Sequence, residues 1–195
     1  MPKVVDHDIQ RRKFADAAIR LIARDGLEGM TMRAVSAEAG LSYGSLFHYF
    51  ASKDELLMLV IRHSTDMQTQ RLNEYATRHS GLKALNHLLC DDAIVDEASR
   101  DEMAVWLAFL HKAASLQSFE ALNEELADGW LERIQSLLDE ARDAGEIRKD
   151  VDTAFEAKTI WALTSGVGQH GLLHPKLIPA GLQRRLITSY LDKLQ

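Results

Sequence analysis

The sequence predicts an all-α protein, built as an N-terminal tri-helical helix-turn-helix head followed by a larger C-terminal helical bundle, with about nine helices. Apolar residues recur at steps of three and four through most of the chain, which is the period of an amphipathic helix. Glycines and prolines fall where these periodic segments end. No segment alternates apolar and polar residues as a half-buried strand would, so the sequence contains no strand signal.

The composition is that of an ordinary globular protein and excludes several classes. Apolar residues make up 46% of the 195 residues and charged residues 27%, which argues against a disordered or fibrous chain. The longest aliphatic run, residues 56–61, is too short to span a membrane, and the first twelve residues lack the apolar core of a signal peptide. A single cysteine, Cys90, fits a reducing compartment. We therefore expect a cytoplasmic protein that does not enter membranes.

Capping residues mark the first helices. An apolar face predicts a first helix that ends at Gly26; it is formed by Phe14, Ala17, Ala18, Leu21 and Ile22. Thr31 is expected to cap a short helix that closes at Gly40. Ser42 is expected to cap a second short helix that runs to Tyr49. Three helices within about 50 residues therefore form the predicted head.

A capping box divides the chain. The pattern S-x-x-E at residues 52–55 precedes an aliphatic run and predicts the start of a long helix that reaches about residue 80. We place the boundary between the head, residues 1–52, and the body, residues 53–195, at this box. The helical period continues through the body in five further segments: residues 82–91, 99–116, 118–144, 152–173 and 180–194.

The most specific pattern is T-M-R-A-V-S-A-E-A-G-L-S-Y-G-S-L-F-H-Y-F over residues 31–50. Two short helices flank a turn at Gly40, where a positive φ favours glycine. Val35, Leu41 and Leu46 are spaced to form an apolar wedge between the two helices. This arrangement is typical of a helix-turn-helix. Because such a pair is too small to be stable alone, we expect the first helix to complete its core.

The second short helix directs polar and aromatic groups away from this wedge, a set suited to bases and phosphates in a major groove. Gly44 would let the backbone approach a base. Thr31 and Lys53 begin neighbouring helices, where free N–H groups favour a phosphate oxygen. Packing against the head is the alternative for His48 and Tyr49. The candidate DNA contacts are Thr31, Arg33, Ser42, Tyr43, Gly44, Ser45, His48, Tyr49 and Lys53.

The distribution of charge limits any DNA contact to a small patch. Residues 1–55 carry eight basic and eight acidic side chains, and the remaining residues carry 15 and 21, so the acidic excess lies entirely downstream. A protein that coats nucleic acid without sequence preference would be basic throughout, because phosphate neutralisation supplies that binding.

Residues 31–57, above all G-L-S-Y-G-S-L-F-H-Y-F-A-S-K-D-E-L-L, resemble the DNA-binding head of the tetracycline-repressor (TetR) family of transcriptional regulators. The resemblance covers about residues 8–60, and residues 106–109 are faintly similar to the branch of choline-responsive repressors. It implies a DNA-binding domain at residues 1–52 and an effector-binding and dimerisation domain at residues 53–195. It further implies a homodimer that binds a palindromic operator and that a small-molecule effector releases.

Two residues depart from the family pattern. Phe47 stands where family members often have a tyrosine whose hydroxyl reaches a phosphate, which puts one backbone contact in doubt. Ser36 replaces the usual alanine between the two short helices. A buried hydroxyl at that position needs a carbonyl partner, because an unpaired one would lower stability.

The body gives weaker signals. No basic cluster occurs in its helices, so we expect an apolar or aromatic effector. Met103, Trp106 and Trp130 are the candidate pocket residues, although core packing is the default for each. The last two helices are the candidate dimer interface through Ile160, Leu163, Leu182, Leu186, Tyr190 and Leu191.

No pattern indicates catalysis, a metal or a cofactor. The G-x-G-x-x-G match at residues 166–171 lacks the strand that a dinucleotide site requires, so close helix packing or a local unwinding of the helix is the better interpretation. His170 and His174 have metal-ligand spacing but no third ligand. We therefore expect no enzyme. A helical protein-interaction adaptor, whose acidic surface would suit basic partners, is the alternative to a DNA-binding regulator.

Overall fold

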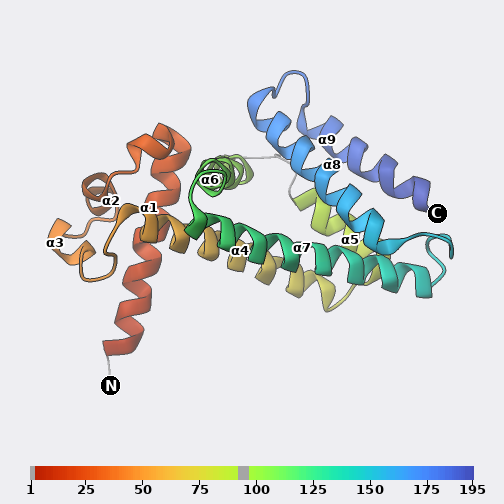
Figure 1. The fold of residues 1–195 in the computed structure, drawn as a ribbon, viewed down its shortest axis with the longest axis horizontal. Coiled ribbons are helices and arrows are strands. Elements are labelled where there is room, and N and C mark those ends of the chain that lie inside the picture. Colours follow the sequence, from red (N-terminus) through yellow and green to blue (C-terminus); the bar gives the residue numbers. More distant parts are fainter. Residues whose placement is uncertain (1–2, 92–96) are drawn as a thin grey trace. The chain divides into compact units, whose positions relative to one another are not determined.

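The computed structural model describes residues 3–91 and 97–195 and confirms the all-α fold (Figure 1). Within these ranges it contains nine α-helices, a short 3-10 helix and no strand. The helices are α1 (Lys3–Gly29), α2 (Met32–Glu38), α3 (Tyr43–Leu46), α4 (Lys53–Ala76), α5 (Gly81–Asp91), α6 (Glu97–Ala113), α7 (Gln117–Asp143), α8 (Thr153–Leu173) and α9 (Ala180–Leu191), followed by η1 (Asp192–Leu194).

The described residues form two compact units. The first takes in the chain up to Gln68 together with Ala104–Leu122, and the second takes in Thr69–Met103 and Asn123–Gln195. Both are units of packing, and the functional division predicted between residues 52 and 53 stays a prediction. None of the helices in the described ranges combines the length and apolarity that crossing a bilayer requires.

The predicted tri-helical head lies in the first unit. Its core is made of fully buried side chains from α1, α2 and α3 and from the segment that leads into α4: Phe14, Ala17, Ala18, Val35, Leu46 and Phe50. Thr31 and Ser42 cap α2 and α3 as predicted, since each hydroxyl oxygen accepts a hydrogen bond of 3.1 Å from the backbone N–H three residues on. Gly40 has the positive φ, 66°, that the turn requires.

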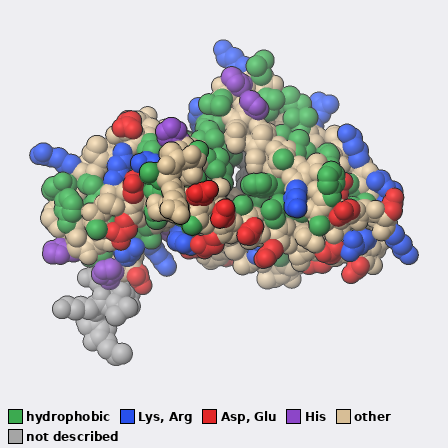
Figure 2. Space-filling view, viewed as in Figure 1, with side chains coloured by type: hydrophobic (Ala, Val, Ile, Leu, Met, Phe, Trp, Pro, Cys, Tyr) green, Lys and Arg blue, Asp and Glu red, His purple; other side chains and the backbone are tan. Residues whose placement is uncertain are grey.

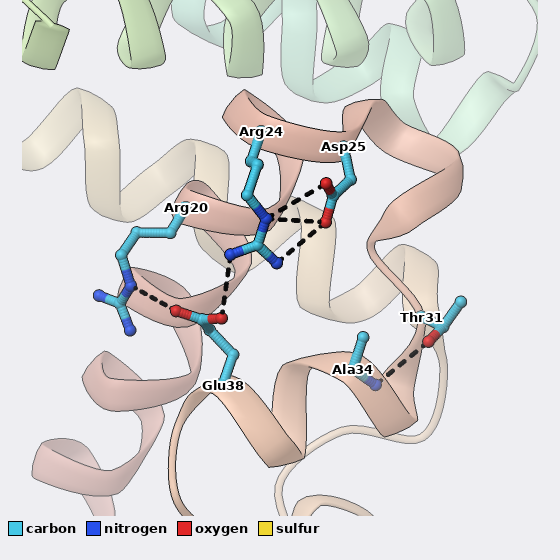
Figure 3. A network of polar contacts seen from close by, with 6 residues as sticks. All are labelled: Arg20, Arg24, Asp25, Thr31, Ala34 and Glu38. Atoms are coloured by element: carbon cyan, nitrogen blue, oxygen red, sulfur yellow. Dashed lines mark hydrogen bonds and ion pairs between the residues drawn. The ribbon is translucent and has the colours of Figure 1, made fainter.

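Ion pairs fix α2 against α1 (Figure 3). Arg20 Nε lies 2.9 Å from one carboxylate oxygen of Glu38, and Arg24 Nη1 lies 3.4 Å from the other. The hydrogen bond from Arg20 is the main cause of a lowered pKa of Glu38. Both arginines are exposed and Glu38 is half-buried, so the contribution of these ion pairs is chiefly to orientation.

The predicted start of α4 after the S-x-x-E pattern is confirmed, with one of the two bonds of a capping box in place. The hydroxyl oxygen of Ser52 accepts a hydrogen bond of 3.1 Å from the Glu55 N–H, and Glu55 Oε2 accepts one of 2.7 Å from the Ala51 N–H. The carboxylate therefore returns to the residue before the cap instead of to the cap itself. The bond from the Glu55 N–H satisfies one of the N–H groups that the start of a helix leaves without partners, whereas the bond from the Ala51 N–H ties the residue before the cap to the first turn.

Three helix ends differ from the prediction. Helical bonding in α1 resumes after a kink at Gly26, whose φ of 72° and ψ of 179° are a backbone conformation essentially confined to glycine. Helix α3 stops at Leu46, because His48 and Tyr49 donate their N–H groups three residues back and so form a tighter turn. Helix α4 ends at Ala76, about four residues before the predicted end.

The second unit has its own core, formed by α5, the later part of α7, α8 and α9. Leu85, Leu88, Ile134, Leu138 and Ile160 are among its fully buried members. Asp152 caps α8 by accepting a hydrogen bond of 3.1 Å from the Phe155 N–H. Helices α8 and α9 lie side by side (Figure 1).

Candidate DNA-binding interface

Helix α3 is held in the head by one face and exposes another. Leu46 and Phe50 are 0% and 1% exposed, so they anchor the helix and the turn after it. Tyr43 and Phe47 are 50% and 49% exposed, and their rings meet edge to face with centroids 5.0 Å apart. Gly44 and His48 are exposed beside them. We call Tyr43, Gly44, Phe47 and His48 the outer face of α3.

Gly44 is not required by the fold. Its φ is not positive, and a Cβ built on it would meet no atom of the chain within 4 Å. Glycine in a helix is less favourable than alanine by about 1 kcal/mol, so the chain accepts a small loss of stability at an exposed position. The bare backbone at this exposed point leaves room for a group outside the chain to approach closely.

Tyr49 lies in the turn after α3 and packs against α1. Its ring is 4.6 Å from His7 and 5.6 Å from Phe14, centroid to centroid, and its carbonyl accepts a hydrogen bond of 3.2 Å from Arg11. The guanidinium of Arg11 also lies 4.9 Å from the centroid of the Phe50 ring. Tyr49 therefore packs against the head, which was the alternative to a DNA contact for both residues, whereas His48 is exposed.

The hydroxyl groups of the candidate contacts already serve the local backbone. Thr31 and Ser42 act as caps, and Ser45 Oγ donates a hydrogen bond of 2.7 Å to the Ser42 carbonyl. Arg33 is exposed on α2. Ser36 is 2% exposed and donates to the Met32 carbonyl over 2.9 Å, which is the partner that its burial required.

Lys53 joins the start of α4 to the end of α1. Its Nζ donates a hydrogen bond of 2.7 Å to the Leu27 carbonyl, and the side chain is half-buried. The next residue, Asp54, pairs with Lys112 over 3.1 Å. The first turn of α4 therefore combines a cation with two carboxylates, those of Asp54 and Glu55.

The three candidate pocket residues are all half-buried, but they belong to different units. Trp106 lies in the first unit, where its ring is 5.2 Å from that of the buried Phe109, centroid to centroid. Trp130 lies in the second unit and packs against its core. Met103 also belongs to the second unit.

The candidate dimer residues differ in exposure. Ile160 and Leu191 are 1% and 4% exposed, so they belong to the core of one chain and offer a second subunit little surface. Leu186 is exposed, and the remaining residues, Leu163, Leu182 and Tyr190, are half-buried.

Tyr190 also makes a polar contact inside one chain. Its hydroxyl donates a hydrogen bond of 2.6 Å to Glu156 Oε2. Burial first, and then this hydrogen bond, raise the pKa of Tyr190 to about 12.

Sequence reasoning missed three exposed apolar residues on α8 and in the turn after it, namely Phe155, Leu173 and Leu177. Hydrophobic side chains lie beside histidines at the tip where α8 turns towards α9 (Figure 2). The signal was that α8 carries apolar residues on every side and only two residues, Glu156 and Lys158, of the Asp, Glu, Lys and Arg types. A helix without a polar face is expected to be covered on both sides. We call Phe155, Leu173, Leu177 and Leu186 the α8–α9 surface.

The described part of the chain brings no three His, Cys, Asp or Glu side chains together as a set of metal ligands. His170 and His174 stack with their ring centroids 5.7 Å apart. Residues 166–171 lie inside α8, where a Cβ at Gly171 would collide with the side-chain amide of Gln183 on α9. This glycine therefore allows close helix packing, as predicted.

Comparison with known proteins identifies the family. Residues 14–59 match the model described as bacterial regulatory proteins of the tetR family, and residues 82–195 match the C-terminal model of BetI-type transcriptional repressors. The HTH-type transcriptional regulator PksA of Bacillus subtilis is 30% identical over 196 residues, which cover 100% of this chain and 94% of PksA.

Solved structures share the fold. A transcriptional regulator from Saccharomonospora viridis in complex with choline has a TM-score of 0.86 at 22% identity, with 95% of this chain and 96% of that one covered. The SmeT–triclosan complex has a TM-score of 0.78 at 19% identity, with 95% and 91% covered. From the two family matches and the full-length likeness to PksA, the chain belongs to the TetR family of transcriptional regulators.

Proposed function

We propose that this regulator is a repressor that binds a palindromic operator as a homodimer and that a small-molecule effector releases from DNA. The observation that carries the proposal is the outer face of α3. It places an open backbone position, Gly44, beside two half-exposed aromatic rings and an imidazole, on a helix whose other side is anchored in the head. A major groove admits such a helix and offers hydrogen-bonding groups and a methyl group at the base edges.

The proposed contacts divide into two groups. Tyr43, Gly44 and His48 face the bases, because they lie on the outer face of α3. Arg33, with the hydroxyl groups of Thr31, Ser42 and Ser45, binds the phosphate backbone and so fixes the register of α3.

Two further candidates combine a structural role with a DNA contact. The Lys53 ammonium donates one hydrogen bond to the Leu27 carbonyl, and an ammonium group has three protons to donate, so it can also bind a phosphate. Tyr49 packs against Phe14 of α1, and its half-buried side chain is also proposed to contact DNA.

Selection of duplexes from a random pool by the purified protein tests DNA binding. We expect an enriched inverted repeat whose half-sites are separated by whole turns of DNA, because two identical heads related by a twofold axis must meet successive grooves. Binding should weaken steeply with salt, and Arg33→Ala should reduce the slope by about one released counterion per head. Absence of any enriched repeat at low salt would contradict the proposal and favour the protein-interaction adaptor.

The α8–α9 surface is the proposed dimer interface, together with Leu163, Leu182 and Tyr190. Large exposed apolar side chains gathered on neighbouring elements indicate an interaction site, and a second copy supplies a self-complementary partner. Sedimentation velocity at micromolar concentration should give a dimer. A monomer under these conditions would contradict this part of the proposal.

The proposed effector is small and apolar or aromatic, and the residues to test as its contacts are the sequence candidates Met103, Trp106 and Trp130, each taken singly. Support for a small effector comes from the match to a BetI-type C-terminal domain and from two regulators of the same fold that were solved with choline and with triclosan; triclosan is aromatic, whereas choline is a quaternary ammonium cation. Aromatic faces suit both compounds, since they attract quaternary ammonium groups and stack on apolar rings.

Tryptophan fluorescence tests the effector proposal, with choline chloride and triclosan as the first compounds titrated. A compound that binds should change the emission, and Trp106→Phe or Trp130→Phe should weaken its binding. It should also lower operator affinity by up to about a hundredfold, which corresponds to about 3 kcal/mol of coupling. An operator affinity that stays the same when the protein is saturated with every compound that binds would contradict the release mechanism.

A further inference from the structure

Phe47 has no role in the fold that explains its exposure. Phe47 follows α3 directly and is the C-cap residue of that helix. Its neighbours Leu46 and Phe50 are fully buried and already fill the core of the head. Half of Phe47 is open, and its ring is fixed by the edge-to-face contact with Tyr43 four residues earlier. Edge-to-face pairs of this kind hold both rings in a defined orientation. The head therefore presents an apolar ring, oriented by its contact with Tyr43, on the same face as Gly44.

This ring cannot form a hydrogen bond, which limits what it can recognise. A phenyl group offers neither a donor nor an acceptor to a phosphate oxygen or to the polar groups of a base edge. Among the groups that base pairs present in the major groove, the C5-methyl of thymine is the apolar one, and phenylalanine is among the residues that contact it. The deoxyribose is the other apolar group of a duplex, and it lies along the backbone.

We infer that Phe47 contacts the C5-methyl group of one thymine in each half-site, and that the contact with Tyr43 fixes its ring for this purpose. The inference rests on the proposed DNA binding and adds a specificity determinant to it. Phe47 lies beside Gly44 and His48, which the proposed function assigns to base contacts, and this location favours the thymine methyl over the sugar. Each half-site should accordingly contain one thymine whose methyl group is needed for full operator affinity.

Deoxyuridine scanning tests the inference, because deoxyuridine pairs as thymidine does but lacks the methyl group. Each thymine of the selected operator is replaced symmetrically in both half-sites, one position at a time, and the affinity is measured by fluorescence anisotropy at fixed salt. At one position we expect a loss of about fourfold per half-site, or roughly fifteenfold in all, from the transfer free energy of one methyl-sized group. The other positions should change affinity by less than about twofold, which is far below this expected loss.

Protein variants then assign the effect to Phe47. Phe47→Ala should bind the natural operator about as weakly as the wild type binds the substituted one, and the deoxyuridine change should cost it nothing further. Phe47→Leu keeps an apolar side chain and should retain part of the deoxyuridine effect. Met67→Ala is the matched control: it removes a 44% exposed apolar side chain from α4 and should leave the full effect in place.

The outcomes separate this inference from the proposed function. If the wild type selects an operator but no deoxyuridine position weakens binding, or if Phe47→Ala keeps the full effect, the inference is overturned while DNA binding stands. A loss of affinity in Phe47→Ala that no deoxyuridine position reproduces would assign Phe47 to the sugar and would equally overturn it. If the wild type selects no operator, the proposed function itself fails.

Discussion

Two parts of this protein expose large apolar side chains, and they differ in what surrounds those side chains. The outer face of α3 is small, with two aromatic rings beside a bare backbone position and an imidazole on a four-residue helix and the turn after it. The α8–α9 surface extends over two longer helices and the turn between them, and its large exposed side chains are one phenylalanine and three leucines. A small mixed surface suits base edges, whereas an extended apolar surface suits a second copy of the chain.

The largest effect should come from charging the α8–α9 surface. The double variant Leu173→Glu/Leu177→Glu places two carboxylates where the partner subunit is proposed to pack, so the protein should become monomeric. Operator affinity should then fall by roughly a hundredfold or more, because linking two binding modules gives a gain of this order. Analytical ultracentrifugation and anisotropy measure the two results.

Met67→Glu is the control for that experiment, since it adds a charge at an exposed apolar residue outside the α8–α9 surface. It should remain dimeric and bind the operator normally. If the Leu173→Glu/Leu177→Glu protein remained dimeric, the α8–α9 surface would not be the dimer interface, and the exposure of its apolar side chains would need another explanation.

The next effect concerns Gly44. Gly44→Ala should fold at least as stably as the wild type, since a Cβ meets nothing within 4 Å and alanine favours a helix. It should nevertheless bind the operator roughly tenfold more weakly, equivalent to about 1.4 kcal/mol, because the added methyl group keeps the backbone away from the DNA. Thermal unfolding and anisotropy measure stability and binding separately. Unchanged affinity would show that DNA does not approach this position.

Substitution of Gly40 should have the opposite effect on stability from substitution of Gly44. Its φ of 66° is one that a side chain disfavours, so Gly40→Ala should lower the free energy of unfolding by about 1–2 kcal/mol. Chemical denaturation of both variants shows the contrast: one glycine serves the fold, and the other serves binding. A Gly40→Ala protein as stable as the wild type would mean that the turn relaxes into another conformation.

The smallest effect concerns Tyr190, near the α8–α9 surface. Tyr190→Phe removes the hydrogen bond to Glu156 and should cost about 1 kcal/mol at neutral pH. The folded pKa of about 12 lies above the ordinary value of about 10, so this stabilisation is complete below pH 10 and is lost as the pH rises towards 12.

Urea denaturation at pH 7.5 and pH 11 checks this prediction. The difference between wild type and Tyr190→Phe should shrink at the higher pH. Tyr43→Phe is the matched control, because the Tyr43 side chain is half exposed, and it should match the wild type in stability at both pH values. A constant difference between Tyr190→Phe and the wild type would contradict the assigned cause of the pKa shift.

Most of the fold could be predicted, because helix starts depend on local hydrogen bonds that short sequence patterns specify. Thr31, Ser42 and Asp152 cap α2, α3 and α8 through side-chain bonds to residues three positions on. Helix ends were harder. At Gly26 the chain kinks and helical bonding resumes, and this depends on packing that the sequence pattern does not contain.

The candidate site was predictable in outline but not for every side chain. Helix α3 is too short for helical periodicity to predict the direction in which the Tyr49 side chain, just after it, points. The contacts of the Tyr49 ring with His7 and Phe14 determine that direction instead. The bond from Lys53 to the Leu27 carbonyl joins residues far apart in the sequence, so no local pattern indicates it. Phe155 was missed because α8 has apolar residues on every side and therefore no face that sequence alone can select.

Amide hydrogen exchange with and without the selected operator tests the central claim most directly, that the outer face of α3 is the surface that meets DNA. Peptides covering residues 42–48 should become protected at saturating operator, whereas peptides covering residues 170–178 should exchange at the same rate in both samples, since the proposed dimer forms without DNA. Unchanged exchange over residues 42–48 in an operator-saturated protein would contradict the account.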